Sequence, residues 1–268
     1  MSIERPEGDL IQALIRGLGV ITAISGATSG LTLSEVSRRA NTTRATSRRI
    51  LLTLESVGYV SRHDGRFFLT ARVLELGYAY LSSLGVWQVC RPHLVELSDK
   101  LDTSVSVGVL DRHRVVYVSR VPGRKITSIS PKVGTRIPAH ASSMGRVLLA
   151  ARDPAEVHEL LSARPLSAYT PQTVTDIQSI EDILIDVKRN GWALVEDELE
   201  VGLRAVAVPL RRGTGEVVAA MNVGFHRALI SNERSQAEIL PAMYKAAELI
   251  SQDLGRLDPP QDTIETVS

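Results

Sequence analysis

The chain has 268 residues, of which 44% are hydrophobic, so it is long enough for two ordinary domains that each bury a core. No run approaches the roughly 18 apolar residues that a membrane-spanning helix needs, and the first nine residues carry three acids and no apolar stretch, so we expect neither export nor membrane insertion. The single cysteine, Cys90, excludes an internal disulfide and fits a reducing cytoplasm.

The net charge is only +1, yet positive charge is concentrated near the N-terminus. Residues 1–70 contain nine arginines and six acidic residues, and five of the arginines lie between Glu35 and Glu55 with no acid among them. This asymmetry indicates a nucleic-acid-binding module, and a solvated charged face is the alternative that charge alone leaves open.

Helical signals begin close to the N-terminus. Asp9 and Gln12 have the spacing of a capping box and open a first helix. Thr32 and Glu35 repeat that spacing and open a short second helix, which runs to about Ala40. The apolar stripe of the first helix consists of Leu10, Leu14, Leu18, Ile21 and Ile24.

A third helix follows after a turn at Asn41. Thr43 is a good N-cap for it, and Gly58 suits the left-handed conformation after its end. Its predicted buried stripe is Ile50, Leu54 and Val57.

The arginines of the third helix are predicted to point away from the core. At 100° per residue Arg48 lies roughly opposite Ile50. Two helices joined by a tight turn, with basic and hydroxyl residues near the start of the second, are typical of a helix-turn-helix that enters the DNA major groove. The predicted DNA contacts on this helix are Thr43, Arg44, Ala45, Thr46, Ser47, Arg48 and Arg49.

The segment "YVSRHDGRFFL" alternates polar and apolar residues around Asp64-Gly65, which predicts a two-residue hairpin. The hairpin would form a wing, with Arg62 and Arg66 near the phosphate backbone or the minor groove. A helical bundle with a hairpin and solvated arginines is the structural alternative.

The stretch "LSEVSRRANTTRATSRRILLTLESVGYV" resembles the winged helix-turn-helix of the IclR family of bacterial transcriptional regulators. "VGTRIPAHASSMGRVLLA" and "EDELEVGLRAVAVPL" resemble two signature stretches of the family's ligand-sensing domain, in the same order. The resemblance covers about residues 10–255. It implies an α+β protein with a DNA-binding domain, a linker helix and a GAF-like effector domain with an antiparallel sheet, assembled as a homodimer or a dimer of dimers.

We therefore expect a winged helix-turn-helix domain at residues 1–70, a linker helix at 71–85, an effector-binding domain at 86–257 and a disordered tail at 258–268. In the effector domain the patterns predict a helix at 86–102, strands at 104–110, 114–121 and 126–130, and a helix opened by "AHASSMG". "LRAVAVPL" and "EVVAAMNVGF" would pair as antiparallel strands. Asp153 opens an outer helix with Pro154 in its first turn, and residues 233–254 form a closing helix.

Enzymatic alternatives have weak support in the sequence. The six histidines show no i, i+4 pair and the lone cysteine adds no ligand cluster, so we predict no metal site and no cofactor. Ser142 and Ser143 near His140 lack the G-x-S-x-G context of a nucleophile. "RRGTGEV" is close to a dinucleotide glycine motif but joins two strands, so we interpret it as a hairpin turn.

A small-molecule pocket is the stronger interpretation. The helix after Pro138 would present backbone N–H groups, the hydroxyls of Ser142 and Ser143 and its positive dipole end, which favour a small carboxylate. The alternative is that both serines only cap the helix while Met144 packs in the core. Arg136, His140 and Arg146 could add positive charge.

The resemblance, motif by motif, implies effector contacts at further positions. Some relatives have an acid where Val195 lies and a cysteine where Ala205 lies, so their effector chemistry does not transfer directly. With the residues of the helix start, the predicted effector-binding set is His140, Ser142, Ser143, Met144, Leu203, Ala205, Asn222 and Gly224.

"PAHASSMGRVLLA" is most similar to the subgroup that governs breakdown of aromatic acids through protocatechuate and β-ketoadipate. We expect a cytoplasmic, sequence-specific regulator of a near-palindromic operator in double-stranded DNA, controlled by a small organic acid such as a hydroxybenzoate or a β-ketoadipate-type catabolite. The alternatives are a small-molecule-binding enzyme with a fused DNA-binding module, and a packaging protein that binds DNA without sequence preference.

Overall fold

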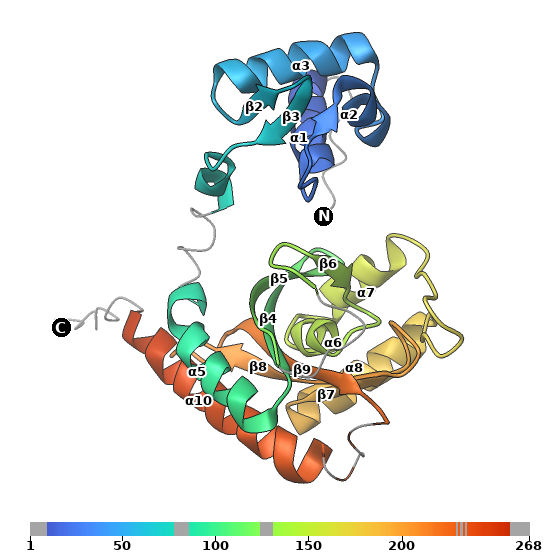
Figure 1. Ribbon diagram of the computed structural model, residues 1–268. Coiled ribbons are helices and arrows are strands. Elements are labelled where there is room, and N and C mark those ends of the chain that lie inside the picture. The colour runs from blue at the N-terminus through green and yellow to red at the C-terminus, as the bar shows by residue number, and fades with distance from the viewer. Residues whose placement is uncertain are drawn as a thin grey trace, which may run out of the picture. The chain divides into compact units, whose positions relative to one another are not determined.

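The structure is a computed structural model that describes residues 10–77, 86–123, 131–228, 230, 233 and 235–257 (Figure 1). The chain divides into two compact units, with the boundary between residues 80 and 81. Predictions that fall wholly or partly outside the described residues include the capping residue Asp9, the strand at 126–130, the linker helix at 71–85 beyond residue 77, and the tail at 258–268.

The N-terminal unit packs its helices against a small antiparallel sheet with the strand order β1-β3-β2. Its elements are α1 (Gln12–Ile24), β1 (Leu31–Thr32), α2 (Leu33–Arg39), α3 (Arg44–Ser56), β2 (Val60–His63) and β3 (Arg66–Leu69). Its core consists of Val20, Ile24, Leu31, Val36, Leu51, Val60 and Phe67.

The predicted caps and turns of α2, α3 and the hairpin are confirmed. Thr32 and Glu35 form a reciprocal capping box, in which the Glu35 carboxylate accepts from the Thr32 backbone N–H at 2.8 Å. Thr43 accepts from the Thr46 backbone N–H and opens α3. Gly58 has φ of 81° after the end of α3, and Asp64 at the hairpin has φ of 49°, so both adopt the left-handed region that these turns require.

Two predictions for the helices are wrong. Helix α1 begins at Gln12 with Ile11 as its N-cap and no side-chain cap, so it starts later than predicted; the predicted capping residue, Asp9, lies outside the described residues. In α3 the fully buried positions are Ser47 and Leu51. Ile50 and Leu54 of the predicted stripe are partly buried against the core, while Val57 follows the helix end and is 44% exposed. The helix is rotated relative to the predicted stripe because Leu51 fits between α1, α2 and the sheet, and Val57 already belongs to the turn.

The C-terminal unit is built on one six-stranded antiparallel sheet with the order β6-β5-β4-β9-β8-β7. Its elements are α5 (Val86–Leu101), β4 (Ser104–Asp111), β5 (Arg114–Val121), β6 (Arg136–Pro138), α6 (Ser143–Ala150), α7 (Pro154–Ser162), α8 (Ile177–Asn190), β7 (Ala193–Glu196), β8 (Leu203–Arg211), β9 (Val217–His226), η2 (Ser235–Ile239) and α10 (Leu240–Leu257).

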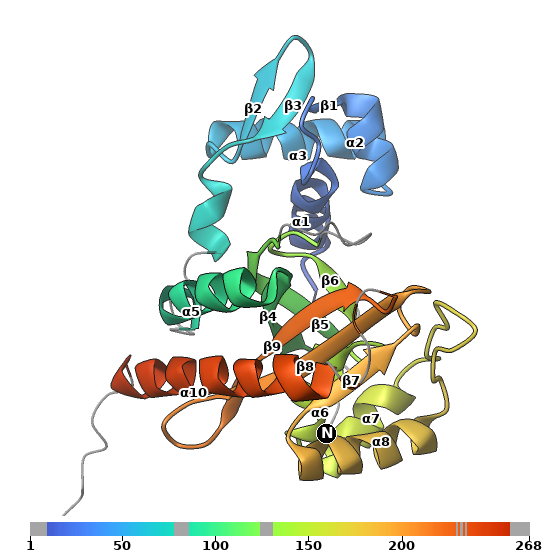
Figure 2. The ribbon, with the colours of Figure 1, turned by 60° about the horizontal axis from the view of Figure 1, so that its bottom comes forward.

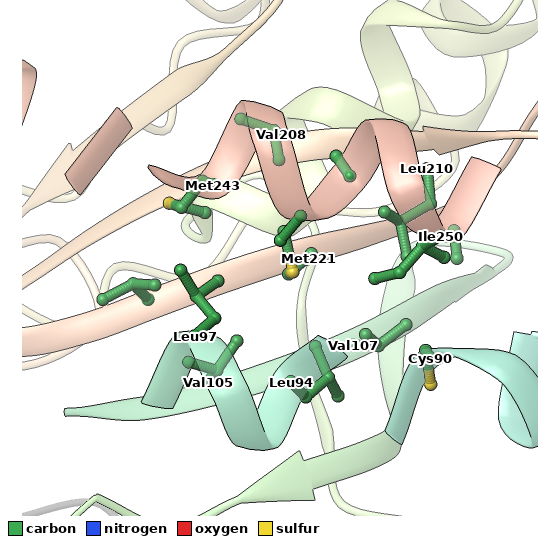
Figure 3. Close-up of a cluster of buried hydrophobic side chains, with 14 of the residues drawn as sticks. Cys90, Leu94, Leu97, Val105, Val107, Val208, Leu210, Met221, Met243 and Ile250 are labelled. Atoms are coloured by element: carbon green, nitrogen blue, oxygen red, sulfur yellow. The ribbon is translucent and has the colours of Figure 1, made fainter. Parts of the chain in front are cut away.

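Helices cover both faces of this sheet. Helices α5 and α10 lie side by side on one face, and α6, α7 and α8 cover the other, which we call the α6 face (Figure 2). Side chains along β4 alternate between the two faces of the sheet, and Val105 and Val107 lie on the α5–α10 side. There they pack with Leu94, Met221 and Ile250 (Figure 3). The intervening residues of β4, β8 and β9 therefore face α6.

The predicted strands and helices of this unit are confirmed where the structure describes them, with one difference at the C-terminus. A short π-helix, η2, precedes α10, so the closing α-helix runs from Leu240 to Leu257 rather than from 233 to 254. Helix α8 and strands β6 and β7 were not predicted. Helix α8 nevertheless carries strong local signals, since Asp176 caps its start and Gly191 ends it with φ of 78°.

Candidate functional site

A cavity of about 360 Å³ lies between the α6 face of the sheet and the first turn of α6. Its volume falls in the range of small-molecule sites, roughly 300–1,000 Å³. Strands and loops that are far apart in the sequence supply its wall. The residues that line it are Ser104, Ser106, Arg114, Tyr117, Arg120, Pro131, Arg136, Ile137, Pro138, Ala141, Ser142, Ser143, Met144, Tyr169, Val195, Leu199, Leu203, Ala205, Asn222 and Gly224.

Three polar side chains stand side by side on adjacent strands of this wall. We call them the polar row: Arg120, Ser106 and Asn222. In the sheet register Ser106 of β4 lies opposite Arg120 of β5 and opposite Asn222 of β9. Residues directly opposite each other in antiparallel strands point to the same face. Ser104 lies on that face too, and its Oγ accepts a hydrogen bond from Nη2 of Arg120 at 3.1 Å.

The two serines at the start of α6 play different roles. Ser142 is the N-cap, and its Oγ accepts from the Gly145 backbone N–H at 3.3 Å and donates to the Pro138 carbonyl at 2.8 Å. The capping alternative therefore describes Ser142. Ser143 is 1% exposed, and its Oγ has no hydrogen-bond partner among the residues that the structure describes.

Asn222 shares this property, because its buried Oδ1 also lacks a partner within the described part of the chain. A buried polar atom without a hydrogen bond costs about 1–3 kcal/mol. Such atoms are rare in folded proteins, and a bound molecule or water commonly satisfies them. Two of them on one cavity indicate a site that is completed by a polar ligand.

Charged and phenolic groups line the same cavity. Burial lowers the pKa of the Arg120 guanidinium, while the neighbouring Tyr117 raises it. Burial raises the pKa of Tyr117 to about 12, so its hydroxyl stays protonated at neutral pH and can donate a hydrogen bond. Arg136 is different, because its guanidinium is ion-paired with Asp111 and both side chains are nearly half exposed.

Two loops close one side of the cavity and are tied to each other. The backbone N–H of Tyr169 donates to Oγ1 of Thr173 at 2.9 Å. The same hydroxyl donates to the Glu198 carbonyl at 2.6 Å, directly before Leu199. These bonds hold Tyr169 and Leu199, which both line the cavity, at fixed positions.

The structure corrects the predicted role of His140 and the suggested role of Arg146. His140 does not line the cavity, although its neighbour Ala141 does, and its Nε2 lies 3.1 Å from the Ser167 carbonyl. Arg146 is buried behind the cavity, where it forms an ion pair with Glu198 at 2.7 Å. His140 is thus engaged with the loop at Ser167 and Arg146 with Glu198, and neither residue lines the cavity.

The start of α3 presents a basic surface in the N-terminal unit. Its exposed residues include Arg44, Ala45, Arg48 and Arg49. Thr43 and Thr46 are engaged in the helix cap, where their hydroxyls lie 2.9 Å apart. Ser47 is fully buried one turn before Leu51, so the prediction that it contacts DNA is corrected.

The hairpin carries one freely exposed arginine and one that is held in place. Arg62 of β2 is exposed. Arg66 of β3 donates from Nη1 to the Gly30 carbonyl at 3.2 Å and lies 3.6 Å from the Glu35 carboxylate. Arg66 therefore also links the hairpin to the start of α2.

Other kinds of site have no counterpart in the described residues. Their histidine, cysteine and acidic side chains form no group of three that could hold a metal ion. None of their helices is both long enough and apolar enough to cross a membrane.

Several cavity residues were not predicted from the sequence, and the polar ones include Arg114, Arg120, Tyr117, Ser104 and Ser106. One signal was available for the serines. "SVSVGVL" alternates serine with valine, which indicates a strand with one polar face inside an otherwise apolar segment. No local signal connected this strand to Asn222, more than a hundred residues later.

Comparisons with known proteins agree with this architecture. The family model described as "IclR helix-turn-helix domain" matches residues 13–64, and the model "Bacterial transcriptional regulator IclR C-terminal" matches residues 78–252. The chain belongs to the IclR family. It is thus a DNA-binding transcriptional regulator with a helix-turn-helix domain and a C-terminal α/β domain.

Individual IclR-family relatives cover nearly the whole chain. The Pca regulon regulatory protein of Pseudomonas putida is 35% identical over 92% of this chain and 85% of its own length. The p-hydroxybenzoate hydroxylase transcriptional activator of Acinetobacter baylyi is 32% identical over 89% of this chain and 90% of its own. These relatives support the aromatic-catabolism subgroup within the IclR family.

Solved IclR-type structures share the fold over a similar extent. A protein from Rhodococcus sp. RHA1 assigned as a transcriptional regulator superposes with a TM-score of 0.81 and 41% identity, covering 93% of this chain and all of that one. An IclR homologue from Microbacterium hydrocarbonoxydans in complex with 4-hydroxybenzoate gives a TM-score of 0.80 and 28% identity, over 92% of this chain and all of that one.

Proposed function

We propose that this regulator senses a small aromatic acid, or a β-ketoadipate-type acid derived from one, in the cavity beside α6, and that binding changes its affinity for an operator. The observation that carries the proposal is a pair of buried polar atoms on one cavity, Ser143 Oγ and Asn222 Oδ1, that have no hydrogen-bond partner among the residues the structure describes. The complex of a homologue with 4-hydroxybenzoate and the names of the aromatic-catabolism relatives support this ligand class.

The proposed effector contacts follow from the lining of the cavity. They keep most of the predicted set and omit His140 and the hydroxyl of Ser142. The small residues Ala205 and Gly224 leave room over the sheet, and the side chains of Met144 and Leu203 supply apolar walls. The proposed contacts are Ser143, Met144, Leu203, Ala205, Asn222 and Gly224.

We further propose that the domain binds its ligand without chemical turnover and works in the cytoplasm. A serine nucleophile needs a base within hydrogen-bond reach. The Oγ of Ser143 has no such partner among the described residues, and the ring of His140 bonds to Ser167 instead. Chromatography of the mixture after the protein has been incubated with 4-hydroxybenzoate should recover all of the acid unchanged. Loss of an amount of acid equal to or greater than the amount of protein would support an enzyme.

The sensor proposal is tested with Ser143→Leu, which fills the cavity at a position that is 1% exposed. Calorimetric titration with 4-hydroxybenzoate, protocatechuate and β-ketoadipate should give binding of at least one acid to wild-type protein and none to the variant. Ser162→Leu makes the same change at an exposed position of α7, outside the cavity, and should bind as wild type does.

Operator binding is then measured for the same proteins with and without the acid. A coupling of about 1–3 kcal/mol would change operator affinity roughly 5- to 150-fold in wild type. Ser143→Leu should bind the operator but lose this response. Unimpaired acid binding by Ser143→Leu would locate the pocket elsewhere, and an operator affinity that never responds to a bound acid would refute the sensor.

A further inference from the structure

The two ends of the cavity offer different chemistry to a ligand. Asn222 stands on β9 at one end of the polar row, and Ser143 opens α6 above the same cavity; within the described part of the chain the buried Oδ1 and Oγ of these two residues have no hydrogen-bond partner. Both groups are neutral. Arg120 stands on β5, two strands away from Asn222 along the polar row, which corresponds to about 10 Å between Cα positions.

The Arg120 end carries the positive charge that is built into the sheet. Its guanidinium extends over Ser104, whose Oγ accepts one of its hydrogen bonds at 3.1 Å, and Tyr117 lies nearby with a protonated hydroxyl. A guanidinium has five donors in a planar fork that matches a carboxylate. Two other cations line the cavity: Arg136 is already ion-paired with Asp111, and Arg114 stands at the opposite end of β5 from Arg120.

Between the two ends the cavity floor is formed by small side chains. Ser106 occupies the middle of the polar row, and Gly224 and Ala205 lie in the adjacent row of the register, in line with Ser104. The apolar side chain of Met144 lines the cavity from α6. A flat ring fits such a space, with one substituent directed to each end.

We propose that Arg120 binds the carboxylate of the effector, and that Ser143 and Asn222 bind a neutral hydroxyl at the opposite end of the same molecule. This inference rests on the proposed function and adds an orientation to it. It places the carboxylate at β5. The sequence alone instead predicts a carboxylate at the start of α6. The matching ligand class is a hydroxy-substituted aromatic acid whose hydroxyl lies across the ring from its carboxylate.

The experiment uses three probes that separate the two ends. Isothermal calorimetry compares 4-hydroxybenzoate with 4-hydroxybenzamide, which lacks the negative charge, and with benzoate, which lacks the hydroxyl. Wild-type protein should prefer 4-hydroxybenzoate to each of the other two. The ratio of acid to amide affinity reports on the carboxylate end, and the ratio of 4-hydroxybenzoate to benzoate affinity reports on the hydroxyl end.

Arg120→Gln should lower the affinity for 4-hydroxybenzoate about 10- to 100-fold and change the affinity for 4-hydroxybenzamide less than about threefold. The reason is that a charge-assisted hydrogen bond is stronger than a neutral one. Asn222→Ala should bring the ratio of 4-hydroxybenzoate to benzoate affinity close to one and leave the acid preference intact. Arg152→Gln, an exposed arginine outside the cavity, is the matched control. Thermal unfolding and operator binding without ligand check the fold.

The possible outcomes separate the inference from the proposed function. If wild type binds none of the organic acids, the sensor proposal and this inference both fail. If it binds 4-hydroxybenzoate and Arg120→Gln keeps the acid preference, or Arg136→Gln removes it instead, only the orientation is overturned. Should Arg120→Gln not fold, Arg120→Lys keeps a charge without the planar fork, and an acid affinity equal to wild type would contradict the role of Arg120.

Discussion

At the residue scale, the buried ion pair of Arg146 and Glu198 connects the framework to the cavity. Arg146 is 3% exposed and Glu198 is 7% exposed, and Nη2 of Arg146 lies 2.7 Å from Oε2 of Glu198. Arg146 also donates from Nε to the His140 carbonyl, and the Glu198 carboxylate accepts from the Val174 backbone N–H at 3.1 Å. One pair thus holds the turn before α6 and the loops that carry Tyr169 and Leu199.

Removing one partner of this pair should be strongly destabilising. Glu198→Ala leaves the Arg146 charge buried, and breaking such a pair costs about 3–5 kcal/mol. Urea unfolding followed by circular dichroism measures the change. Glu159→Ala, at an exposed position of α7, is the control and should stay within about 0.5 kcal/mol of wild type. A loss below about 1 kcal/mol in Glu198→Ala would mean that the pair does not support the fold.

At the element scale, helix α3 combines an inward and an outward face. Ser47 and Leu51 face the core, one turn apart, and the outward residues include Arg44, Arg48 and Arg49. The cap at Thr43 fixes where the helix starts and hence which residues reach outward near its N-terminus. A helix-turn-helix places this end against base edges.

Substitutions on α3 should separate base contact from phosphate contact. Arg48→Ala should weaken specific operator binding by about 1–3 kcal/mol if Arg48 contacts a base. Arg49→Ala should mainly reduce the salt dependence, lowering the slope of log affinity against log salt concentration by about one. Fluorescence anisotropy with operator and scrambled DNA at several salt concentrations measures both. Operator affinity that is unchanged in both variants would move the recognition surface away from α3.

Helices α5 and α10 are joined at the element scale by His93 and Asp253, whose side chains lie 2.8 Å apart. The hydrogen bond from His93, and then Arg256, holds the pKa of the Asp253 carboxyl below its usual value. A carboxyl with a lowered folded-state pKa contributes stability above its unfolded pKa, near 4, and loses it as the pH falls through the folded value.

Asp253→Asn should therefore be less stable than wild type at pH 7, and the difference should shrink below about pH 4. Thermal unfolding at a series of pH values measures it, with Asp99→Asn, an exposed position of α5, for comparison. A stability difference that stays constant from pH 7 to pH 3 would show that ionisation of Asp253 plays no part.

At the scale of the whole molecule, helix α1 leaves an apolar face uncovered. Ile11 is 70% exposed and Leu14 is 59% exposed, and Ile15 and Leu18 continue the same face. A groove beside it is lined by α1 and α3. We propose that a second copy of the chain covers this face in a homodimer, or in a dimer of dimers, that reads a near-palindromic operator, since two-fold symmetry in the protein matches two half-sites.

Leu14→Glu together with Leu18→Glu should weaken this assembly and lower operator affinity, while acid binding in the other unit stays unchanged. Sedimentation velocity at micromolar concentration, with and without operator, gives the oligomeric state. Ile185→Glu together with Val201→Glu, both at exposed positions of the C-terminal unit, adds the same two charges elsewhere and is the control. A wild-type protein that is monomeric both alone and on DNA would contradict the proposed dimer.

Much of the fold could be predicted because its signals are local. The capping box of Thr32, the N-cap Thr43 and the Asp64-Gly65 turn each depend on residues within four positions of one another, and all three are confirmed. The rotation of α3 could not be predicted as easily, since Ile50 and Leu51 are both apolar. Packing against α1, α2 and the sheet decided that Leu51 is fully buried.

The sequence by itself determined the family, the two kinds of domain and the positions of most helices and strands, because caps, periodicity and signature stretches act over short distances. Only the tertiary structure decided which residues meet at the cavity. Arg120, Ser106 and Asn222 become neighbours through the register of β5, β4 and β9. That register depends on how the whole sheet packs against helices on both faces, and a shift of one residue would turn all three side chains to the other face.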